Sequence, residues 1–413
     1  MEGKLRKFHL FPLFAIGISI FYYIHFLDNF FTHDDFRYLE NMYRGWVDVL
    51  LGYSSLRLIS NLSWWPLFVI SETNPFAYNL FALIIYSANS ILLYFLLLRL
   101  LPDRVTAFLA SAFFITSSVG VDALFWKATN SSLISLFFYL STLIYYADYR
   151  HSGRQKQYNL ALVLYVFAIF SKEEAASLPF IAALIDVVFF GGWQDKRRLF
   201  MRIIPFCAVI LCYIIANAVV FNFMMGVPAA SQRMFGLRPL YSLLGGGTAF
   251  FLAPDGFFKL NSTPVYITVL FILLSFLLKR SRRLLLFGYF WIFFAFLPQS
   301  LSMQGQFEPK VIIDSISRYL YITSIGASVV FAVVLTGLRE WIPAKIWYGL
   351  AGSTLFFFIW IHYPKVKVRG EEWQHQGVLV KDFITELKRV MPTFPSPCYI
   401  YMGASPAGRS FLA

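Results

Sequence analysis

Charged residues are scarce in this chain of 413 residues. Asp, Glu, Lys and Arg together make up 14% of it, whereas an ordinary soluble domain carries about 25%. Hydrophobic residues make up 58% and aromatic residues 20%. A water-soluble fold cannot bury this much apolar surface, so the composition excludes an ordinary soluble enzyme.

Three other features are missing, and each absence excludes a class of protein. Only three cysteines occur, Cys207, Cys212 and Cys398, without a paired framework or metal-ligand spacing, so we predict no disulfide. No small-x-small cleavage pattern follows the first apolar run, which is longer than that of a signal peptide, so we expect an uncleaved span. The short alternating segments of a membrane barrel are also absent.

Long apolar runs are what the sequence does contain. Runs of about 18–22 residues match a helix that crosses the apolar core of a bilayer. They predict an all-α polytopic membrane protein with about eleven spans. The expected spans are 8–27, 76–100, 105–121, 130–147, 158–170, 175–190, 199–221, 264–278, 284–297, 319–337 and 345–363.

The net charge of +13 is concentrated in the short gaps between these runs. Such placement follows the positive-inside pattern and does not point to nucleic acid. It predicts a cytoplasmic N-terminus and an extracytoplasmic C-terminus. We expect a transmembrane module over 1–363, with a first outer loop at 28–75 that carries amphipathic helices and a long outer loop at 222–263. A short extracytoplasmic segment, 364–413, completes the expected organisation.

The stretch "NFFTHDDFRYL" follows the first span directly and carries the first candidate site residues. Asp34 and Asp35 are adjacent, so their side chains point in different directions, and one can act as a general base while the other anchors the loop. His33 is the one histidine to which we assign a site role. The plain alternative is two solvated acids on an outer loop. A metal on these three residues is the other alternative, but consecutive residues rarely wrap one ion, so we predict none.

Basic and acidic residues at other expected outer span ends complete the candidate set. Lys127 lies in "FWKATNSS", Lys172 and Glu173 lie in "FSKEEAASLPF", and Arg318 and Tyr319 open "SRYLYITSIG". The ordinary fate of such cations is to reach the headgroups from the end of a span. Together they could instead bind a lipid phosphate, for which Lys and Arg are suitable partners.

Several of these motifs, in this order, resemble GT-C glycosyltransferases, which are membrane enzymes that use polyprenyl-phosphate sugars. "THDDF" is similar to their acidic motif after the first span. "FAYNLFALIIYSANSILLYFLLLRLL", "FSKEEAASLPF" and "SRYLYITSIG" resemble segments of the branch that includes protein O-mannosyltransferases and the TPR-bearing eukaryotic O-mannosyltransferases. The chain departs from that branch at Lys127, where relatives often carry arginine, at Thr323, where they often carry proline, and in having no TPR array.

The resemblance implies a GT-C-like bundle and an inverting transfer of a sugar from a polyprenyl-phosphate donor to an acceptor hydroxyl on the outer face of the membrane. It implies that Asp34 is the general base and Asp35 supports it. It also implies that Lys172, Glu173 and Arg318 line the site and contact the lipid-linked phosphate. His33, Lys127 and Tyr319 are further candidate contacts to the lipid phosphate or the sugar, chosen from their positions in the sequence. No cofactor is required, and a divalent metal is not predicted. The expected partners are the donor, a glycan, lipid or protein acceptor, and membrane lipids, in a bacterial inner membrane.

Three other functions remain open from the residues alone. A transporter or flippase of lipid-linked glycans would share the many spans and the basic clusters, but transporters usually carry ionisable groups at mid-membrane. Charges near the middle of the expected spans are almost absent here. A polymerase or ligase of surface polysaccharide would not need the acidic first loop. A noncatalytic scaffold is the remaining alternative.

Overall fold

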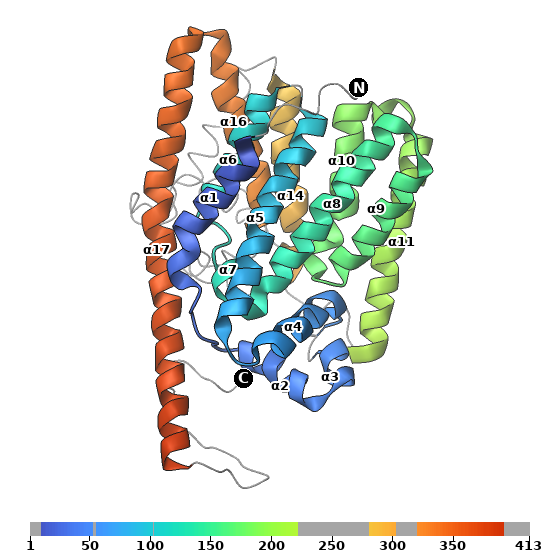
Figure 1. Ribbon diagram of the computed structural model, residues 1–413. Coiled ribbons are helices and arrows are strands. Elements are labelled where there is room, and N and C mark those ends of the chain that lie inside the picture. Colours follow the sequence, from blue (N-terminus) through green and yellow to red (C-terminus); the bar gives the residue numbers. More distant parts are fainter. Residues whose placement is uncertain (1–9, 53–54, 102, 222–280, 303–319, 392–413) are drawn as a thin grey trace.

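The structure is a computed structural model, and it describes residues 10–52, 55–101, 103–221, 281–302 and 320–391 (Figure 1). Within these ranges all regular structure is helical and no strand occurs. The expected all-α fold is therefore confirmed for the part of the chain that is described. The longer helices run side by side as a bundle.

Each helix follows from an apolar run or an amphipathic segment of the sequence. The described elements are α1 (Leu10–Tyr23), η2 (Ile24–Phe26), α2 (Asp35–Arg44), α3 (Trp46–Leu51), α4 (Leu58–Ser71), α5 (Pro75–Leu100), α6 (Arg104–Thr116), α7 (Asp122–Phe125), η3 (Lys127–Thr129), α8 (Asn130–Ser152), α9 (Gln155–Ile169), η4 (Glu173–Ser177), α10 (Leu178–Phe190), η5 (Gly192–Gln194), α11 (Lys196–Phe221), α14 (Arg282–Ser302), α16 (Thr323–Gly337), η8 (Leu338–Glu340) and α17 (Ala344–Val390).

Four of the described helices are long and apolar enough to cross a membrane: α5, α11, α17 and the continuous segment Thr323–Glu340 that joins α16 to η8. Their length and composition suit a membrane protein. The expected count of about eleven spans is not confirmed, because several apolar helices, such as α4 and α6, are shorter. The expected span 264–278 lies outside the described residues.

The bundle packs through aromatic side chains and a few close helix contacts. Small residues let two membrane helices approach each other. α14 and α16 meet in this way, because a Cβ on Gly326 would lie 2.6 Å from the carbonyl oxygen of Gly288. Larger residues at these two positions would force the helices apart.

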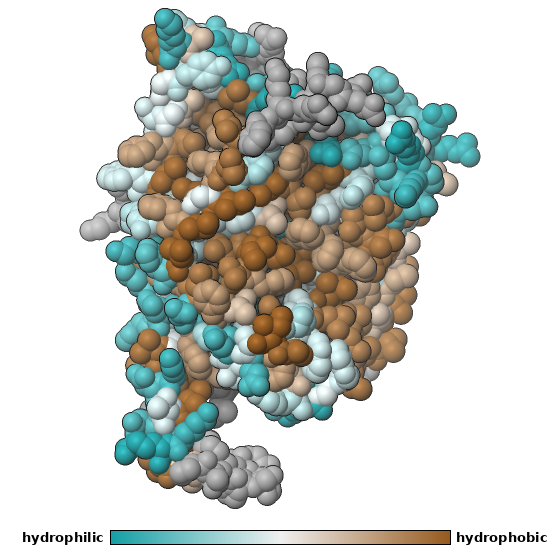
Figure 2. Space-filling view, in the orientation of Figure 1, coloured by the Kyte–Doolittle hydropathy of each residue, from teal (hydrophilic) through white to brown (hydrophobic). Residues whose placement is uncertain are grey.

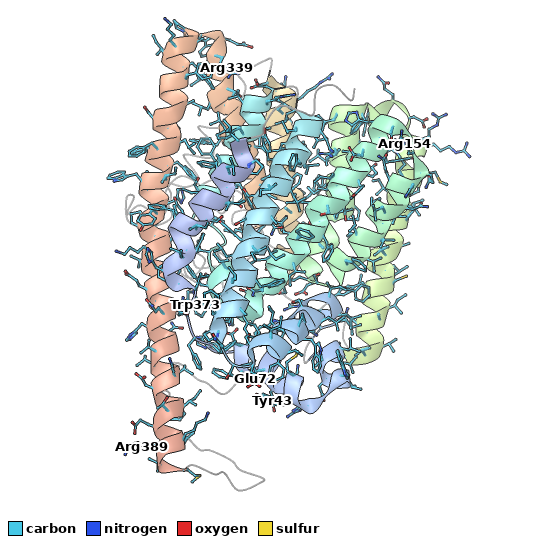
Figure 3. The ribbon with its side chains drawn as sticks, in the orientation of Figure 1. Tyr43, Glu72, Arg154, Arg339, Trp373 and Arg389 are labelled. Carbon is cyan, nitrogen blue, oxygen red and sulfur yellow. The ribbon has the colours of Figure 1, made fainter. Side chains whose placement is uncertain are left out.

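The two ends of the bundle differ in what they carry. At one end, which we term the loop end, α2, α3 and α4 lie below α5 and α8 in Figure 1, and α4 contacts both of these helices. At the opposite end, which we term the basic end, α8 turns into α9 and α10 turns into α11. In Figure 3, Arg154 and Arg339 mark the basic end, and Tyr43 and Glu72 mark the loop end.

α17 differs from the sequence prediction of a span at 345–363 followed by a separate tail. It is one helix of 47 residues that continues through Pro364, and its far part extends beyond the bundle toward Arg389 (Figure 3). Glycines let it pack against the segment after α1. A Cβ on Gly370 would lie 2.5 Å from the ring of Phe26, and one on Gly377 would lie 3.0 Å from the backbone nitrogen of Phe30.

Candidate functional site

Asp35 fastens the first loop to a distant part of the chain. Its carboxylate is fully buried at the start of α2. Oδ2 accepts a hydrogen bond from the backbone nitrogen of Thr32 at 2.9 Å, and Oδ1 accepts one from the backbone nitrogen of Ala128 at 2.6 Å. Burial raises the pKa of Asp35 to about 6, although the charge of Lys127 and the two backbone bonds act in the opposite direction.

Lys127 makes the reciprocal attachment from η3. Its side chain is also fully buried. Nζ donates to the carbonyl oxygens of Asn29 at 2.7 Å and Phe30 at 3.1 Å, and it lies 5.2 Å from the centroid of the Phe31 ring. Burial lowers the pKa of Lys127 to about 8, and the charge of Asp35 opposes that shift. In this structure Lys127 therefore binds the backbone of the first loop.

Asp34 differs from its neighbour in exposure and in partners. It is half-buried and precedes α2, yet its side chain does not cap the helix. Its carbonyl oxygen accepts from the backbone nitrogens of Arg37 at 3.0 Å and Tyr38 at 3.4 Å. Burial raises the pKa of the Tyr38 hydroxyl. Arg57 acts to lower this pKa, and the charges of Glu173 and Asp34 act to raise it. The Asp34 carboxylate thus lies within electrostatic reach of the Tyr38 hydroxyl.

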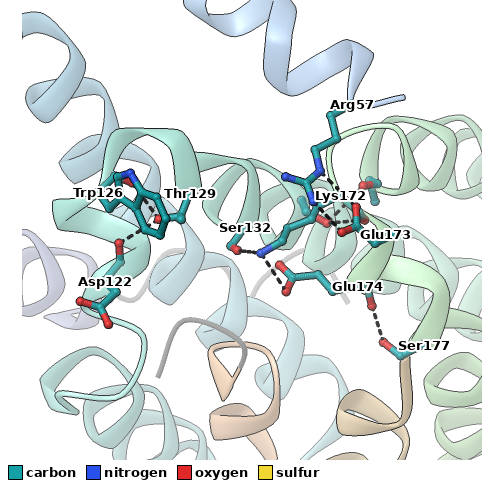
Figure 4. Close-up of polar contacts among 11 residues, drawn as sticks. Arg57, Asp122, Trp126, Thr129, Ser132, Lys172, Glu173, Glu174 and Ser177 are labelled. Carbon is teal, nitrogen blue, oxygen red and sulfur yellow. Dashed lines mark hydrogen bonds and ion pairs between the residues drawn. The ribbon is translucent and has the colours of Figure 1, made fainter. Parts of the chain in front are cut away.

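Arg57 and Glu173 form a two-pronged ion pair, although 116 positions separate them in the sequence. Nη2 of Arg57 lies 2.6 Å from Oε1 of Glu173, and Nε lies 3.1 Å from Oε2 (Figure 4). Burial acts to raise the pKa of Glu173, but Arg57, with help from Lys172, outweighs it and holds that pKa below its usual value. Bidentate pairs of this kind fix geometry as well as charge.

Lys172 and Glu174 form a second pair deeper in the bundle. Both side chains are buried, and Nζ of Lys172 lies 3.4 Å from Oε2 of Glu174. The same Nζ donates to Oγ of Ser132 on α8 (Figure 4). Burial raises the pKa of Glu174, and the charge of Lys172 opposes this. Consecutive residues of "SKEE" therefore bind different partners, and together they place two cations and two carboxylates beside each other.

α17 contacts the first loop next to Asp34. Nε2 of His33 lies 3.1 Å from Oε1 of Gln376, and the imidazole ring lies 6.0 Å from each of the rings of Trp126 and Trp373. His33 adopts a left-handed backbone with φ at +46°, which a non-glycine residue adopts only where its surroundings hold it. The side chain of Gln376 is one of the contacts that hold it.

α17 also binds α7, on the other side of the first loop. The buried carboxylate of Asp122 accepts from Nε of Arg369 at 2.7 Å and from Nε1 of Trp373 at 2.9 Å. Trp373 stacks on Trp126, which leads into η3. Three segments that lie far apart in the sequence are therefore bound to one another at the loop end.

The structure brings six of the candidate residues to the loop end: His33, Asp34, Asp35, Lys127, Lys172 and Glu173. Arg318 and Tyr319 lie outside the described residues. Arg57, Tyr38 and Gln376 are not among the site residues predicted from the sequence. Their partners are remote in the sequence, so nothing in their own neighbourhood marks them.

Chemically, the loop end combines a half-buried carboxylate with two fixed cation–carboxylate pairs. Among the described residues no cluster of three or more His, Cys, Asp or Glu could hold a metal ion. Comparison of the chain with family models and with curated proteins finds no match. The site is therefore interpreted from its own geometry, and the resemblance to GT-C enzymes remains an expectation.

Proposed function

We propose that the chain is an inverting membrane glycosyltransferase that moves a sugar from a polyprenyl-phosphate donor to an acceptor hydroxyl. The observation that carries this proposal is the position of Asp34. Its half-buried carboxylate directly precedes α2, beside Asp35, which is bonded to the backbone nitrogen of Ala128, at the end of the bundle where the first loop lies. The order of the "THDDF", "SKEE" and "RYLY" segments, which resembles GT-C enzymes, supports the same reaction.

The chemistry divides between a base and cations. The acceptor hydroxyl attacks the anomeric carbon, its oxygen forms the new glycosidic bond, and the bond to the polyprenyl phosphate breaks. Asp34 accepts the hydroxyl proton. Negative charge grows on the leaving phosphate, and Arg57, whose side chain is partly exposed, is the cation that contacts it, while the buried Lys172 adds positive charge at longer range. Each is held by a glutamate, so its position is fixed before the donor arrives.

Asp35 and Lys127 have positioning roles in this proposal. Both are buried and bonded to backbone groups, so neither is available to a sugar without breaking the attachment of the first loop. Asp35 holds the start of α2, and thereby the residue before it, which is Asp34. The reaction occurs on the outer face of a bacterial inner membrane, with the N-terminus in the cytoplasm. The acceptor is a hydroxyl of a glycan, a lipid or a protein.

The test is an assay in proteoliposomes that separates transfer from transport. The purified full chain receives a radiolabelled polyprenyl-phosphate sugar and envelope extracts as acceptors. We expect the label to appear in an acceptor, and we expect Asp34→Asn to abolish this while the protein stays folded. Asp28→Asn, at an exposed position of the same loop, is the matched control and retains activity. Movement of the donor across the bilayer without transfer would overturn the proposal in favour of a transporter.

A further inference from the structure

The basic end carries a concentration of exposed positive charge. Five cations lie on its two neighbouring turns and form what we term the basic rim: Arg154, Lys156, Lys196, Arg197 and Arg198. Arg154 belongs to the α8–α9 turn, Lys156 lies at the start of α9, and the other three begin α11. In 153–156 and 191–198 only one acid faces these five cations, Asp195, and it pairs with Arg198 at 3.1 Å.

Buried contacts hold the two turns in place. The fully buried carboxylate of Asp186 on α10 lies 2.9 Å from Arg150 at the end of α8 and 2.8 Å from Arg202 on α11. The hydroxyl of Tyr158 on α9 donates to the carbonyl oxygen of Arg202 at 2.7 Å. The turns are thus ordered without a ligand, so binding across them costs little further conformational entropy.

Exposed apolar side chains continue directly from the basic rim along α11. Lys196, Phe200 and Ile204 are spaced four residues apart, so they share one face of the helix. Phe200 is 66% exposed and Ile204 41% exposed. Trp193 is 66% exposed, and Nζ of Lys196 lies 4.6 Å from the centroid of its ring. Exposed tryptophans of this kind mark the boundary between headgroups and acyl chains.

The surface view shows the same change from hydrophilic to hydrophobic side chains. In Figure 2 hydrophilic side chains cover the upper right of the molecule, and hydrophobic side chains lie directly beneath them. Arg154 stands in this region in Figure 3. A cationic band above an apolar wall matches the two parts of an anionic phospholipid, whereas a nucleic acid would use the charge but not the wall.

We propose that the basic rim binds the phosphate headgroup of an anionic phospholipid from the leaflet at the basic end, with acyl chains along Phe200 and Ile204. The headgroup phosphate lies at Lys196, where the apolar face of Phe200 and Ile204 begins, and Arg197 and Arg198 add positive charge around it. This site is separate from the loop end and does not depend on glycosyl transfer. Either proposal can therefore fail while the other stands.

The experiment is a lipid titration of the purified full chain, read by native mass spectrometry. Phosphatidylglycerol is compared with zwitterionic phosphatidylcholine of the same chains. The rim variant combines Lys196→Gln, Arg197→Gln and Arg198→Gln. The matched control combines Lys381→Gln, Lys388→Gln and Arg389→Gln, which remove the same charge from exposed positions on the far part of α17.

We expect the rim variant to bind phosphatidylglycerol at least about tenfold more weakly, with phosphatidylcholine unchanged and the control close to wild type. In the wild type, binding of phosphatidylglycerol should weaken as the salt concentration rises, and soluble glycerophosphate should compete poorly because it has no chains to lie on the apolar face. Equal losses in the rim variant and the control would overturn the proposal. If the rim variant fails to fold, the wild type alone decides: equal affinity for the two lipids, or no salt dependence, refutes the site.

Discussion

At the basic end, four carboxylates each pair with an arginine: Asp103, Asp148, Asp186 and Asp195. At the loop end, Glu173 and Glu174 are likewise paired with cations, and Asp35 is bonded to two backbone nitrogens. Asp34 behaves differently. Among the described residues it makes no ion pair, and its side chain does not cap the helix that it precedes.

This difference separates acids that hold the fold from an acid that can do chemistry. A carboxylate whose oxygens are bonded to arginines or backbone nitrogens cannot accept a substrate proton without losing those bonds. A half-buried carboxylate that makes no ion pair among the described residues keeps its acceptor capacity in a partly shielded position. The contrast between the bonded acids and Asp34 therefore supports Asp34 as the base, and mutations at both ends of the bundle can test it.

The largest loss of stability is expected at the basic end. Asp186→Asn leaves Arg150 and Arg202 largely buried without their counter-ion, which should lower the free energy of unfolding by about 3–5 kcal/mol. Asp148→Asn removes a pair that is more exposed, with side chains 33% and 27% exposed, and should cost about 1 kcal/mol or less. Unfolding in detergent measures both, and equal losses would contradict the structural role of Asp186.

At the loop end, the corresponding comparison is between the partly buried ion pair of Arg57 and Glu173, the inner pair, and the exposed ion pair of Arg44 and Glu40, the outer pair. Glu173→Gln breaks the two-pronged contact with Arg57 and should cost about 1.5–3 kcal/mol. Glu40→Gln breaks a pair with Arg44 whose side chains are more than half exposed, so it should cost under about 0.5 kcal/mol. The same unfolding assay reports both variants. A Glu173 variant as stable as the Glu40 variant would show that the inner pair does not hold the loop end.

The buried carboxyl group of Asp35 predicts in which direction stability changes with pH. Asp35→Asn replaces an acceptor with a donor opposite a backbone nitrogen and should cost about 1–3 kcal/mol near neutral pH. The folded-state pKa of Asp35, about 6, lies above its ordinary value of 3.8. Its contribution to stability is therefore greatest below the ordinary value and is lost as the pH rises through about 6.

The stability gap between wild type and Asp35→Asn should accordingly widen as the pH is lowered from about 7 to about 4, by up to about 1.4 kcal/mol per pH unit. Unfolding at several pH values measures the gap, and the Asp28→Asn variant supplies the baseline for an exposed acid. A stability difference that narrows as the pH is lowered would mean that burial does not raise the pKa of Asp35 in the folded protein.

A smaller effect on stability than at Asp186, Glu173 or Asp35 is expected at the contact between α17 and the first loop. Gln376→Ala removes the bond to His33, which precedes Asp34, and should cost about 0.5–1.5 kcal/mol. We expect kcat to fall severalfold with the donor KM unchanged, because the variant disturbs the position of the base and not the donor contacts. Gln374→Ala, exposed on the same helix, is the control. A change in both constants, or in neither, would argue against a positioning role.

Much of the fold could be predicted because apolar runs define membrane-type helices locally. Each expected span other than 264–278 overlaps a described helix. The continuity of α17 could not be predicted, because Pro364 and the charged residues after it are typical of a helix end. Packing of Phe26 and Phe30 against Gly370 and Gly377 accompanies its continuation, and contacts of this kind are tertiary.

The site was predictable only in part, for a related reason. Asp34 and Lys172 stand out because acids and cations at the ends of apolar runs are costly. Their partners do not stand out, since the bonds of Arg57 to Glu173 and of Gln376 to His33 join residues more than a hundred positions apart. The sequence also does not distinguish Asp34 from Asp35. Only the tertiary contacts show that the Asp35 carboxylate is bonded to two backbone nitrogens and that the Asp34 carboxylate is not.

The most direct test of the central claim is the turnover of purified Asp34→Asn on a polyprenyl-phosphate sugar. Loss of a general base should lower kcat by about 10²–10⁴-fold, while donor binding and the unfolding transition stay close to wild type. A variant that turns over at the wild-type rate would contradict the assignment of Asp34 as the base.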